Sequence, residues 1–262
     1  MGPQAVNDGG GISRRLNPVV TIKYIRRPDM NKKVAVVTGA SSGIGKAIAE
    51  ELLKNNFQLI LNGRTCNNVF RDNEDIKVNT SDLMDSITAE ELLQSSIASF
   101  GQCDYLFANA GIIESGSIEK INIDKVCEMA RLKVESSYRI IYTFLKYFKT
   151  RNTGHIIITS SVLGTKTREN SGAYAGCNYA LEALAEALRM ELSDTNIQIS
   201  CIEPGLVQTN LHREWPVHPK ELLGISNALL PEDIAQVVME IINKPDYIRI
   251  PKYMILPKGH KI

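Results

Sequence analysis

The sequence predicts an α/β fold in which a doubly wound, parallel β-sheet is flanked by helices. Short apolar runs that end in glycine or small polar residues alternate with longer segments of helical periodicity, which is typical of βαβ units. The length of 262 residues suits one large sheet, and a hydrophobic content of 44% can fill its core. We therefore expect a single domain whose strands are buried between two layers of helices.

The predicted elements follow one another in a regular order. Apolar runs predict strands at residues 34–37, 58–62, 76–79, 105–108, 155–159, 197–202 and 253–256. Apolar residues at helical spacing predict helices at residues 44–55, 88–100, 123–151 and 173–193. Pro231 suits the first turn of one further helix. Right-handed crossovers between the strands would place these helices on both faces of the sheet.

Charge and cysteine content limit the classes of function. The 30 Lys and Arg residues nearly balance the 29 Asp and Glu residues, whereas nucleic acids and acidic membranes attract a basic surplus. No apolar run approaches the ~20 residues that cross a bilayer. The five cysteines form no CxxC pair, and His212 and His218 lack a metal-ligand set. We therefore expect a cytoplasmic protein with no metal site, no nucleic-acid partner and no membrane partner.

The first thirty residues differ in composition from the rest of the chain. They contain three successive glycines at residues 9–11 and lack the apolar core of a secretory signal peptide. Regular apolar patterning begins only after Met30. We therefore predict a flexible N-terminal extension at residues 1–30 and a folded domain at residues 31–262.

A glycine-rich loop joins the first predicted strand to the first predicted helix. Residues 38–45 read TGASSGIG. The glycines permit a tight turn and a close approach of the backbone to a pyrophosphate, and the helix N-terminus offers N–H groups to its negative charge. The alternative, a purely structural turn, accounts less well for three glycines together with two serines. The loop therefore predicts a dinucleotide site.

Several motifs, taken together in order, resemble those of the classical short-chain dehydrogenases/reductases. Residues 38–45 resemble the TGxxxGxG cofactor loop, residues 109–111 read NAG, and residues 204–209 form a PGxxxT pattern. Ser161 and Tyr174 have the spacing of the catalytic serine and tyrosine of the family. The resemblance covers about residues 33–257 and implies a Rossmann-like domain. The C-terminal part is similar to the NADP-dependent 3-hydroxy acid and serine dehydrogenases of the family.

The resemblance also implies a nicotinamide dinucleotide as cofactor. A carboxylate at the end of the second strand would select NAD(H), but this strand ends at Asn62 and Arg64 follows it. A guanidinium can pair with the 2′-phosphate of NADP(H). We therefore expect NADP(H) to be preferred, with NAD(H) as the alternative. The implied cofactor contacts are Gly39, Ser41, Ser42, Gly43, Ile44, Gly45, Asn62, Arg64, Asn79, Asn109, Ala110, Gly111, Tyr174, Pro204, Gly205, Val207 and Thr209.

The catalytic motif departs from the family at one position. The resemblance implies that Ser161 orients the substrate carbonyl and that the hydroxyl of Tyr174 exchanges a proton with it. In the family, a lysine four positions after the tyrosine favours the ionised phenol by its charge. Here that position holds Asn178. Its neutral side chain can hydrogen-bond a ribose but supplies no charge.

Lys133 is the candidate for the missing cation. The catalytic asparagine of the family falls at about position 133, so the resemblance implies that the two residue types are exchanged. At helical spacing, the neighbours of Lys133 are mostly apolar, namely Val126, Met129, Ala130, Ser137, Ile140, Ile141 and Phe144. We predict that Lys133 points inward and favours the ionised phenol of Tyr174. The alternatives are a surface lysine and a degenerate site.

Two functions remain open from the sequence. The first is an NADP(H)-dependent oxidoreductase that interconverts a carbonyl and an alcohol on a small hydroxy acid, aldehyde or ketone. The second is a catalytically impaired, dinucleotide-binding protein that acts as a sensor or partner subunit. Ser161 and Tyr174 favour the first function, and Asn178 favours the second. The resemblance implies a homodimer or homotetramer formed through the helices at 123–151 and 173–193.

Overall fold

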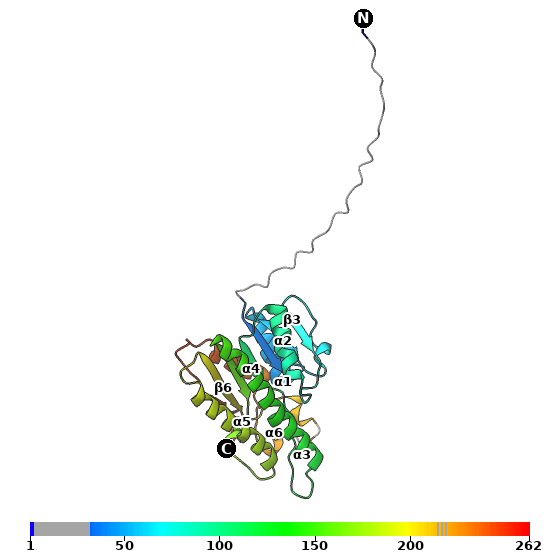
Figure 1. The fold of residues 1–262 in the computed structure, drawn as a ribbon. Coiled ribbons are helices and arrows are strands. Elements are labelled where there is room, and N and C mark those ends of the chain that lie inside the picture. Colours follow the sequence, from blue (N-terminus) through cyan, green and yellow to red (C-terminus); the bar gives the residue numbers. More distant parts are fainter. Residues whose placement is uncertain (3–31, 214, 216, 218) are drawn as a thin grey trace.

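The computed structural model describes residues 1–2, 32–213, 215, 217 and 219–262 (Figure 1). Nearly all of the predicted extension at residues 1–30 therefore lies outside the described residues, and so does His218.

The strands of the described chain form one parallel sheet in the order β3-β2-β1-β4-β5-β6-β7. This order confirms the predicted doubly wound α/β fold, because the chain moves outward in both directions from β1. All seven predicted strands are present among the described residues, and β6 continues two residues further than expected. The strands are Val34–Thr38 (β1), Gln58–Asn62 (β2), Ile76–Asn79 (β3), Tyr105–Ala108 (β4), Gly154–Thr159 (β5), Ile197–Pro204 (β6) and Lys252–Ile255 (β7).

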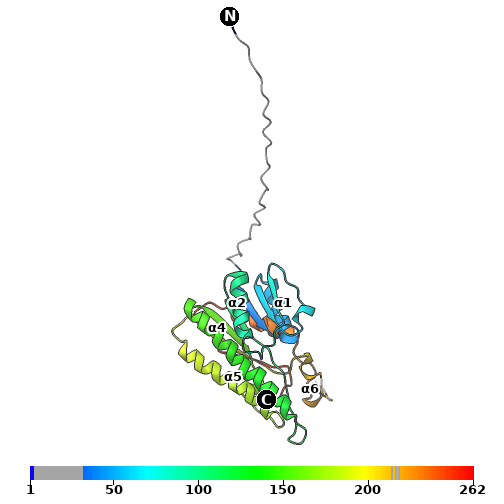
Figure 2. The same cartoon turned by 45° about the vertical axis from the view of Figure 1, so that its right-hand side comes forward.

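Helices cover both faces of the sheet, as Figures 1 and 2 show. Apolar side chains of α1 and α7 pack on one face, and those of α2, α4 and α5 pack on the other. The inner strands β1 and β2 are therefore fully buried, whereas β3 and β7 at the edges of the sheet are partly exposed. The α-helices are Gly43–Lys54 (α1), Thr88–Phe100 (α2), Ile123–Ala130 (α3), Ser137–Arg151 (α4), Gly172–Glu191 (α5), Pro219–Leu222 (α6) and Pro231–Ile242 (α7).

The predicted helix at residues 123–151 is not one regular α-helix. A π-helical segment, Arg131–Ser136, separates α3 from α4 without a break in the chain direction. The hydroxyl of Ser136 donates to the carbonyl oxygen of Arg131 at 3.0 Å, within this wider turn. Such π segments shift the phase of the side chains that follow, and they are frequent at functional sites. Lys133 lies inside this segment.

The ends of the first three strands lie side by side. Thr38 is paired in register with Asn62, and Asn62 with Asn79. In an open parallel sheet, ligands bind outside the carboxyl ends of the strands, where the strand order reverses. Here that position lies between β1 and β4, which carry the TGASSGIG loop and the NAG motif. Within the part of the chain that the structure describes, the helices are too short or too polar to cross a membrane.

Candidate active site

The glycines of the TGASSGIG loop occupy positions that a side chain would disrupt. Gly39 and Gly43 have φ angles of +67° and +53°, which favour glycine. A Cβ at Gly45 would lie 2.3 Å from the carbonyl oxygen of Gly39, and a Cβ at Gly39 would lie 2.9 Å from the Cα of Ala110. The loop therefore brings the backbones of β1, α1 and the NAG motif together, as a site for a pyrophosphate requires.

The N-terminus of α1 keeps its hydrogen-bond donors available. Ser42 precedes the helix in an extended conformation, and its side chain makes no capping hydrogen bond. The first N–H groups of a helix need an acceptor, and a bound phosphate supplies one. A cavity of about 220 Å³ opens beside this N-terminus, and Gly43 and Thr209 contribute to its lining. The loop and the helix end thus fit the phosphate groups of a dinucleotide.

The NAG motif is fixed to the end of β1 by Thr38. The hydroxyl of Thr38 accepts hydrogen bonds from the N–H groups of Asn109 and Ala110, at 3.0 and 3.1 Å. The side-chain amide of Asn109 donates to the carbonyl oxygen of Thr38 at 3.1 Å. Asn109 therefore links the end of β4 to the end of β1. Ala110 and Gly111 follow it at the carboxyl edge of the sheet.

The polar residues at the ends of β2 and β3 bind each other. The Asn62 amide donates to Oδ1 of Asn79 at 2.9 Å and to the carbonyl oxygen of Ser81 at 3.0 Å. Gly63 lies next to Ser41 of the glycine loop. Arg64, by contrast, is exposed and makes no hydrogen bond or ion pair with any described residue. Its guanidinium is therefore available to an anionic group at this edge of the sheet.

The loop after β6 closes the same edge. The N–H group of Gly205, just after Pro204, donates to the carbonyl oxygen of Ile255 at 2.8 Å. Val207 forms an isolated parallel bridge with Leu229. The Thr209 side chain lies against Gly43, 3.1 Å from where a Cβ on that glycine would be. These contacts bring the predicted PGxxxT residues up to the glycine loop, although Thr209 and Gly43 are 166 positions apart in the chain.

Ser161 and Tyr174 stand at the carboxyl end of β5 and the start of α5. Both are buried, and Tyr174 packs in an apolar cluster with Met129 and Leu163. The Ser161 oxygen accepts a hydrogen bond from the N–H group of Leu163 at 3.1 Å. No described residue accepts the hydrogen of this hydroxyl, so it can donate to a substrate oxygen.

Lys133 points inward and lies next to Tyr174. Only 5% of Lys133 is exposed, and its Nζ lies 5.4 Å from the centre of the Tyr174 ring. A Cβ on Gly111 would be 3.2 Å from the same Nζ. No described residue forms a hydrogen bond or ion pair with this ammonium. A buried cation without a carboxylate partner is costly.

The charge of Lys133 also affects the pKa of a neighbouring thiol, Cys177. Burial raises the pKa of the Cys177 thiol, and the Lys133 ammonium offsets part of this rise. Cys177 lies one helical turn after Tyr174 on α5. The Lys133 ammonium is therefore close enough to α5 to act on a side chain near Tyr174.

Asn178 is fully buried on α5, one helical turn after Tyr174. Its side-chain amide donates to the backbone carbonyl oxygen of Tyr174 at 2.8 Å, and its Oδ1 has no hydrogen-bond partner among the described residues. Its Cβ lies near Gly164, and a Cβ on that glycine would also meet the side chains of Ser160 and Glu182. Asn178 therefore binds the backbone of Tyr174 and supplies no charge to the site.

Sequence reasoning missed a buried acidic pair, in which one carboxylate comes from the inward face of α5 and the other from β6. Glu182 and Glu203 are 4% and 2% exposed. The Lys252 ammonium lies 3.0 Å from Glu182 and 3.7 Å from Glu203. Burial, and then the Glu182 carboxylate, raise the pKa of the Glu203 carboxyl above its ordinary 4.5. Glu182 lies eight positions after Tyr174, so the inward face of α5 was the available signal in the sequence.

The raised pKa of Glu203 predicts a pH-dependent stability. Because the folded chain holds this proton more tightly than the unfolded chain, the free energy of unfolding falls as the pH rises from 4.5 through the folded pKa. Glu203→Gln cannot ionise, so its melting temperature relative to the wild type should rise with pH. Glu186→Gln, at an exposed position of α5, is the control. Parallel melting profiles for the wild type and Glu203→Gln would contradict the prediction.

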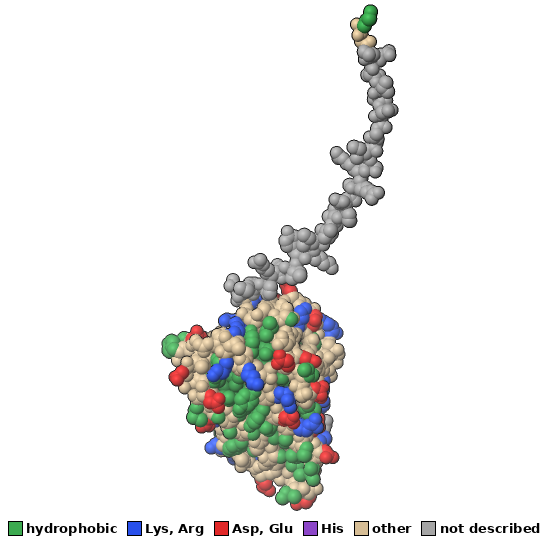
Figure 3. All heavy atoms as spheres, in the orientation of Figure 1, with side chains coloured by type: hydrophobic (Ala, Val, Ile, Leu, Met, Phe, Trp, Pro, Cys, Tyr) green, Lys and Arg blue, Asp and Glu red, His purple; other side chains and the backbone are tan. Residues whose placement is uncertain are grey.

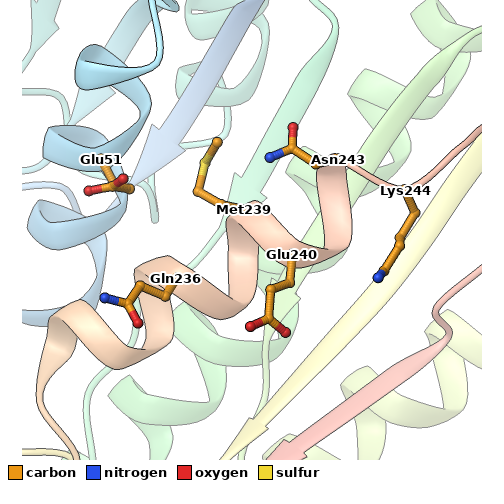
Figure 4. Close-up of a pocket in the computed structure, with 6 residues that line it drawn as sticks. All are labelled: Glu51, Gln236, Met239, Glu240, Asn243 and Lys244. Atoms are coloured by element: carbon orange, nitrogen blue, oxygen red, sulfur yellow. The ribbon is translucent and has the colours of Figure 1, made fainter.

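A larger cavity lies away from all of these residues. It has a volume of about 410 Å³ and opens between the C-terminal parts of α1 and α7 (Figure 4). Glu51 faces it from α1, and the other side chains come from α7 and the residues just after it. It contains none of the predicted site residues.

Comparisons with known proteins agree with the motifs. A family model described as short chain dehydrogenase matches residues 33–219. An uncharacterized oxidoreductase of Staphylococcus saprophyticus is 28% identical over 239 residues, which cover 87% of this chain and 99% of the relative. Another uncharacterized oxidoreductase, of Listeria monocytogenes, is 29% identical over 242 residues, with 87% and 97% covered.

Solved structures have the same fold. An alcohol dehydrogenase of the archaeon Thermococcus sibiricus, complexed with 5-hydroxy-NADP, has a TM-score of 0.77 and 26% identity, covering 88% of this chain and 99% of that one. A closed form of serine dehydrogenase complexed with NADP⁺ has a TM-score of 0.79 at 22% identity, covering 87% and 96%. The second similarity concerns the fold alone.

Proposed function

The chain belongs to the short-chain dehydrogenase family, and we propose that it is an NADP(H)-dependent enzyme that interconverts a carbonyl and an alcohol on a small substrate. The observation that carries this proposal is the buried, unpaired Lys133 ammonium, 5.4 Å from the ring of Tyr174. A positive charge at this place can stabilise the negative charge that a proton-transferring tyrosine develops during turnover.

The dinucleotide fits the site because the glycine loop leaves no room for side chains and α1 presents an uncapped N-terminus. Residues of this loop, the NAG motif and the loop after β6 would hold it. When bound, it supplies the hydride.

The side chains of this protein have separate roles in the proposed reaction. The Ser161 hydroxyl donates to the substrate oxygen and orients it. In reduction, the Tyr174 hydroxyl gives its proton to that oxygen, and the Lys133 ammonium stabilises the phenolate that remains. In oxidation, the phenolate takes the proton back. Small hydroxy acids, aldehydes and ketones are the proposed substrates, on the basis of the family resemblance.

The direct test is consumption of NADPH with a panel of small aldehydes, 3-oxo acids and diketones. Turnover on any of them supports the enzyme. The placement of Asn178, which supplies no charge to the site, favours the second candidate, a dinucleotide-binding sensor or partner subunit. NADPH binding measured by calorimetry, with no turnover on the whole panel, would favour that candidate over the enzyme.

The proposed preference for NADP(H) depends on Arg64. Its exposed guanidinium has no partner in the described chain and follows β2, where the adenosine ribose binds in this type of fold. A hydrogen bond to a charged group contributes about 1.5–3 kcal/mol, so Arg64→Ala should weaken NADPH binding by roughly 10–100-fold and leave NADH binding unchanged. Arg71→Ala, also exposed after β2, is the control. An equal loss for both dinucleotides would contradict a role at the 2′-phosphate.

We also propose a homodimer or homotetramer in the cytoplasm. Figure 3 shows hydrophobic side chains gathered over the face that carries α4 and α5. Tyr142 and Tyr179, one from each helix, are 45% and 41% exposed. An apolar face of this kind favours self-association, and light scattering would report the molar mass of the assembly.

The cysteines support the proposed cytoplasmic location. All five are free thiols, as expected in a reducing compartment.

A further inference from the structure

The C-terminal tail, residues 256–262, returns over the carboxyl edge of the sheet. Leu256 packs against the apolar cluster that contains Tyr174. His260 covers the loop after β6, where a Cβ on Gly205 would lie 2.5 Å from its Nδ1. In Figures 1 and 2, the C-terminus lies at the end of the molecule that carries α3 and α6. The tail therefore lies beside the proposed site, although no motif in it predicts this.

A single side-chain contact joins the tail to the loop before Tyr174. The guanidinium of Arg168 lies 3.1 Å from Nε2 of His260. Arg168 belongs to residues 165–171, which connect the helical turn after Ser161 to α5. This segment also binds the loop after β4, because the N–H group of Gly116 donates to the carbonyl oxygen of Asn170 at 2.9 Å. The loops after β4 and β5 and the tail after β7 thus form one connected rim.

We propose that Arg168 and His260 form a latch that holds the C-terminal tail as a fixed wall of the substrate pocket. The two residues are positioning residues, because they touch the loops that carry the site and not the reacting atoms. The inference rests on the proposed oxidoreductase function. Its direct consequence is that the latch determines the KM for the carbonyl substrate, while kcat depends on Tyr174 and Lys133.

The latch requires a neutral imidazole. Arg168 can only donate, so Nε2 of His260 must accept, and a protonated ring has no acceptor. Burial, and then the Arg168 charge, lower the pKa of His260 below its ordinary 6.5. With Nε2 accepting, the hydrogen of the neutral ring is on Nδ1, so the N–H group of Leu206, 3.4 Å from Nδ1, lies against the ring and does not donate to it in this tautomer. The backbone of Gly205 packs on the same side of the ring. Arg168 is the charged group that acts on it within the described chain. The latch is therefore closed at pH 7 and opens in acid.

The test compares substitutions at His260 in the full-length protein. His260→Ala should raise the KM for the carbonyl substrate about tenfold, the loss expected for one hydrogen bond to a charged group, with kcat and the KM for NADPH unchanged. His260→Gln keeps an acceptor for Arg168 that does not titrate. It should restore the KM and abolish the rise in KM that the wild type shows as the pH falls below 6.5. Lys258→Ala, exposed in the same tail, is the control.

A second readout does not depend on turnover. Hydrogen–deuterium exchange of residues 165–171 and 204–207 should be faster in His260→Ala than in the wild type, and close to the wild type in His260→Gln. Unchanged exchange in His260→Ala would overturn the latch even if the protein is not an enzyme. Faster exchange without any turnover in the wild type would leave the latch in place and count against the proposed function. A fall in kcat with no change in KM would also overturn the inference.

Discussion

Tyr174→Phe should abolish measurable turnover and leave the fold intact. General acid–base catalysis contributes roughly 10²–10⁴-fold to a rate, and this substitution removes the proposed proton donor alone. The Tyr174 hydroxyl makes no hydrogen bond with the described residues, so its removal leaves no buried group unpaired. The ring would still fill the apolar cluster around Met129 and Leu163. The measurement is kcat for NADPH oxidation, beside NADPH affinity and melting temperature.

The control is Tyr247→Phe, in the segment after α7. Tyr247 is 85% exposed and belongs neither to the proposed site nor to the apolar face of α4 and α5. This variant should keep full activity. If Tyr174→Phe retained wild-type kcat, Tyr174 would not be the acid/base, and the reaction proposed here would need another proton donor. If it lost NADPH binding as well as turnover, its role would be in binding.

The inner strands were predictable from the sequence because they are apolar runs buried on both faces. Val34–Thr38 and Gln58–Asn62 lie within one residue of the positions expected from hydrophobicity. The π segment Arg131–Ser136 was not predictable, since apolar spacing gives the face of a helix but does not count residues per turn. The inward direction of Lys133 was nevertheless anticipated, because its apolar neighbours on both sides define the buried face.

The site shows the same division between local and long-range information. The glycine loop and the NAG motif are local in sequence, and the structure brings them together as expected. The pairing of Asn62 with Asn79 and the contact between Arg168 and His260 depend on how distant segments are placed. No sequence spacing encodes that placement, because strand register and loop direction decide it. The lack of a hydrogen-bond or ion-pair partner for the Lys133 ammonium among the described residues also depends on which distant segments surround it.

Lys133→Met should lower kcat and should not lower the melting temperature. Removing one charge-stabilising group from an active site typically costs roughly 10²–10³-fold in kcat, and we expect a fall of about this size. Met has a similar length and suits a site that is 5% exposed. Removing an unpaired buried charge also relieves its desolvation cost. Lys146→Met, at an exposed position of α4, should change neither quantity. A stable variant with wild-type kcat would show that the Lys133 charge has no part in the reaction.

The double exchange, Lys133→Asn with Asn178→Lys, tests whether a lysine at position 178 can replace the lysine at position 133. Position 178 lies one turn after Tyr174 on α5, and α5 packs against the π segment that carries Lys133. A lysine at 178 can therefore extend into the space that Lys133 leaves. Lys133→Asn alone should lose most of kcat, and adding Asn178→Lys should restore much of it, so the two effects should be strongly non-additive. Additive losses would mean that each residue acts separately, and the idea that the two residue types are exchanged would fail.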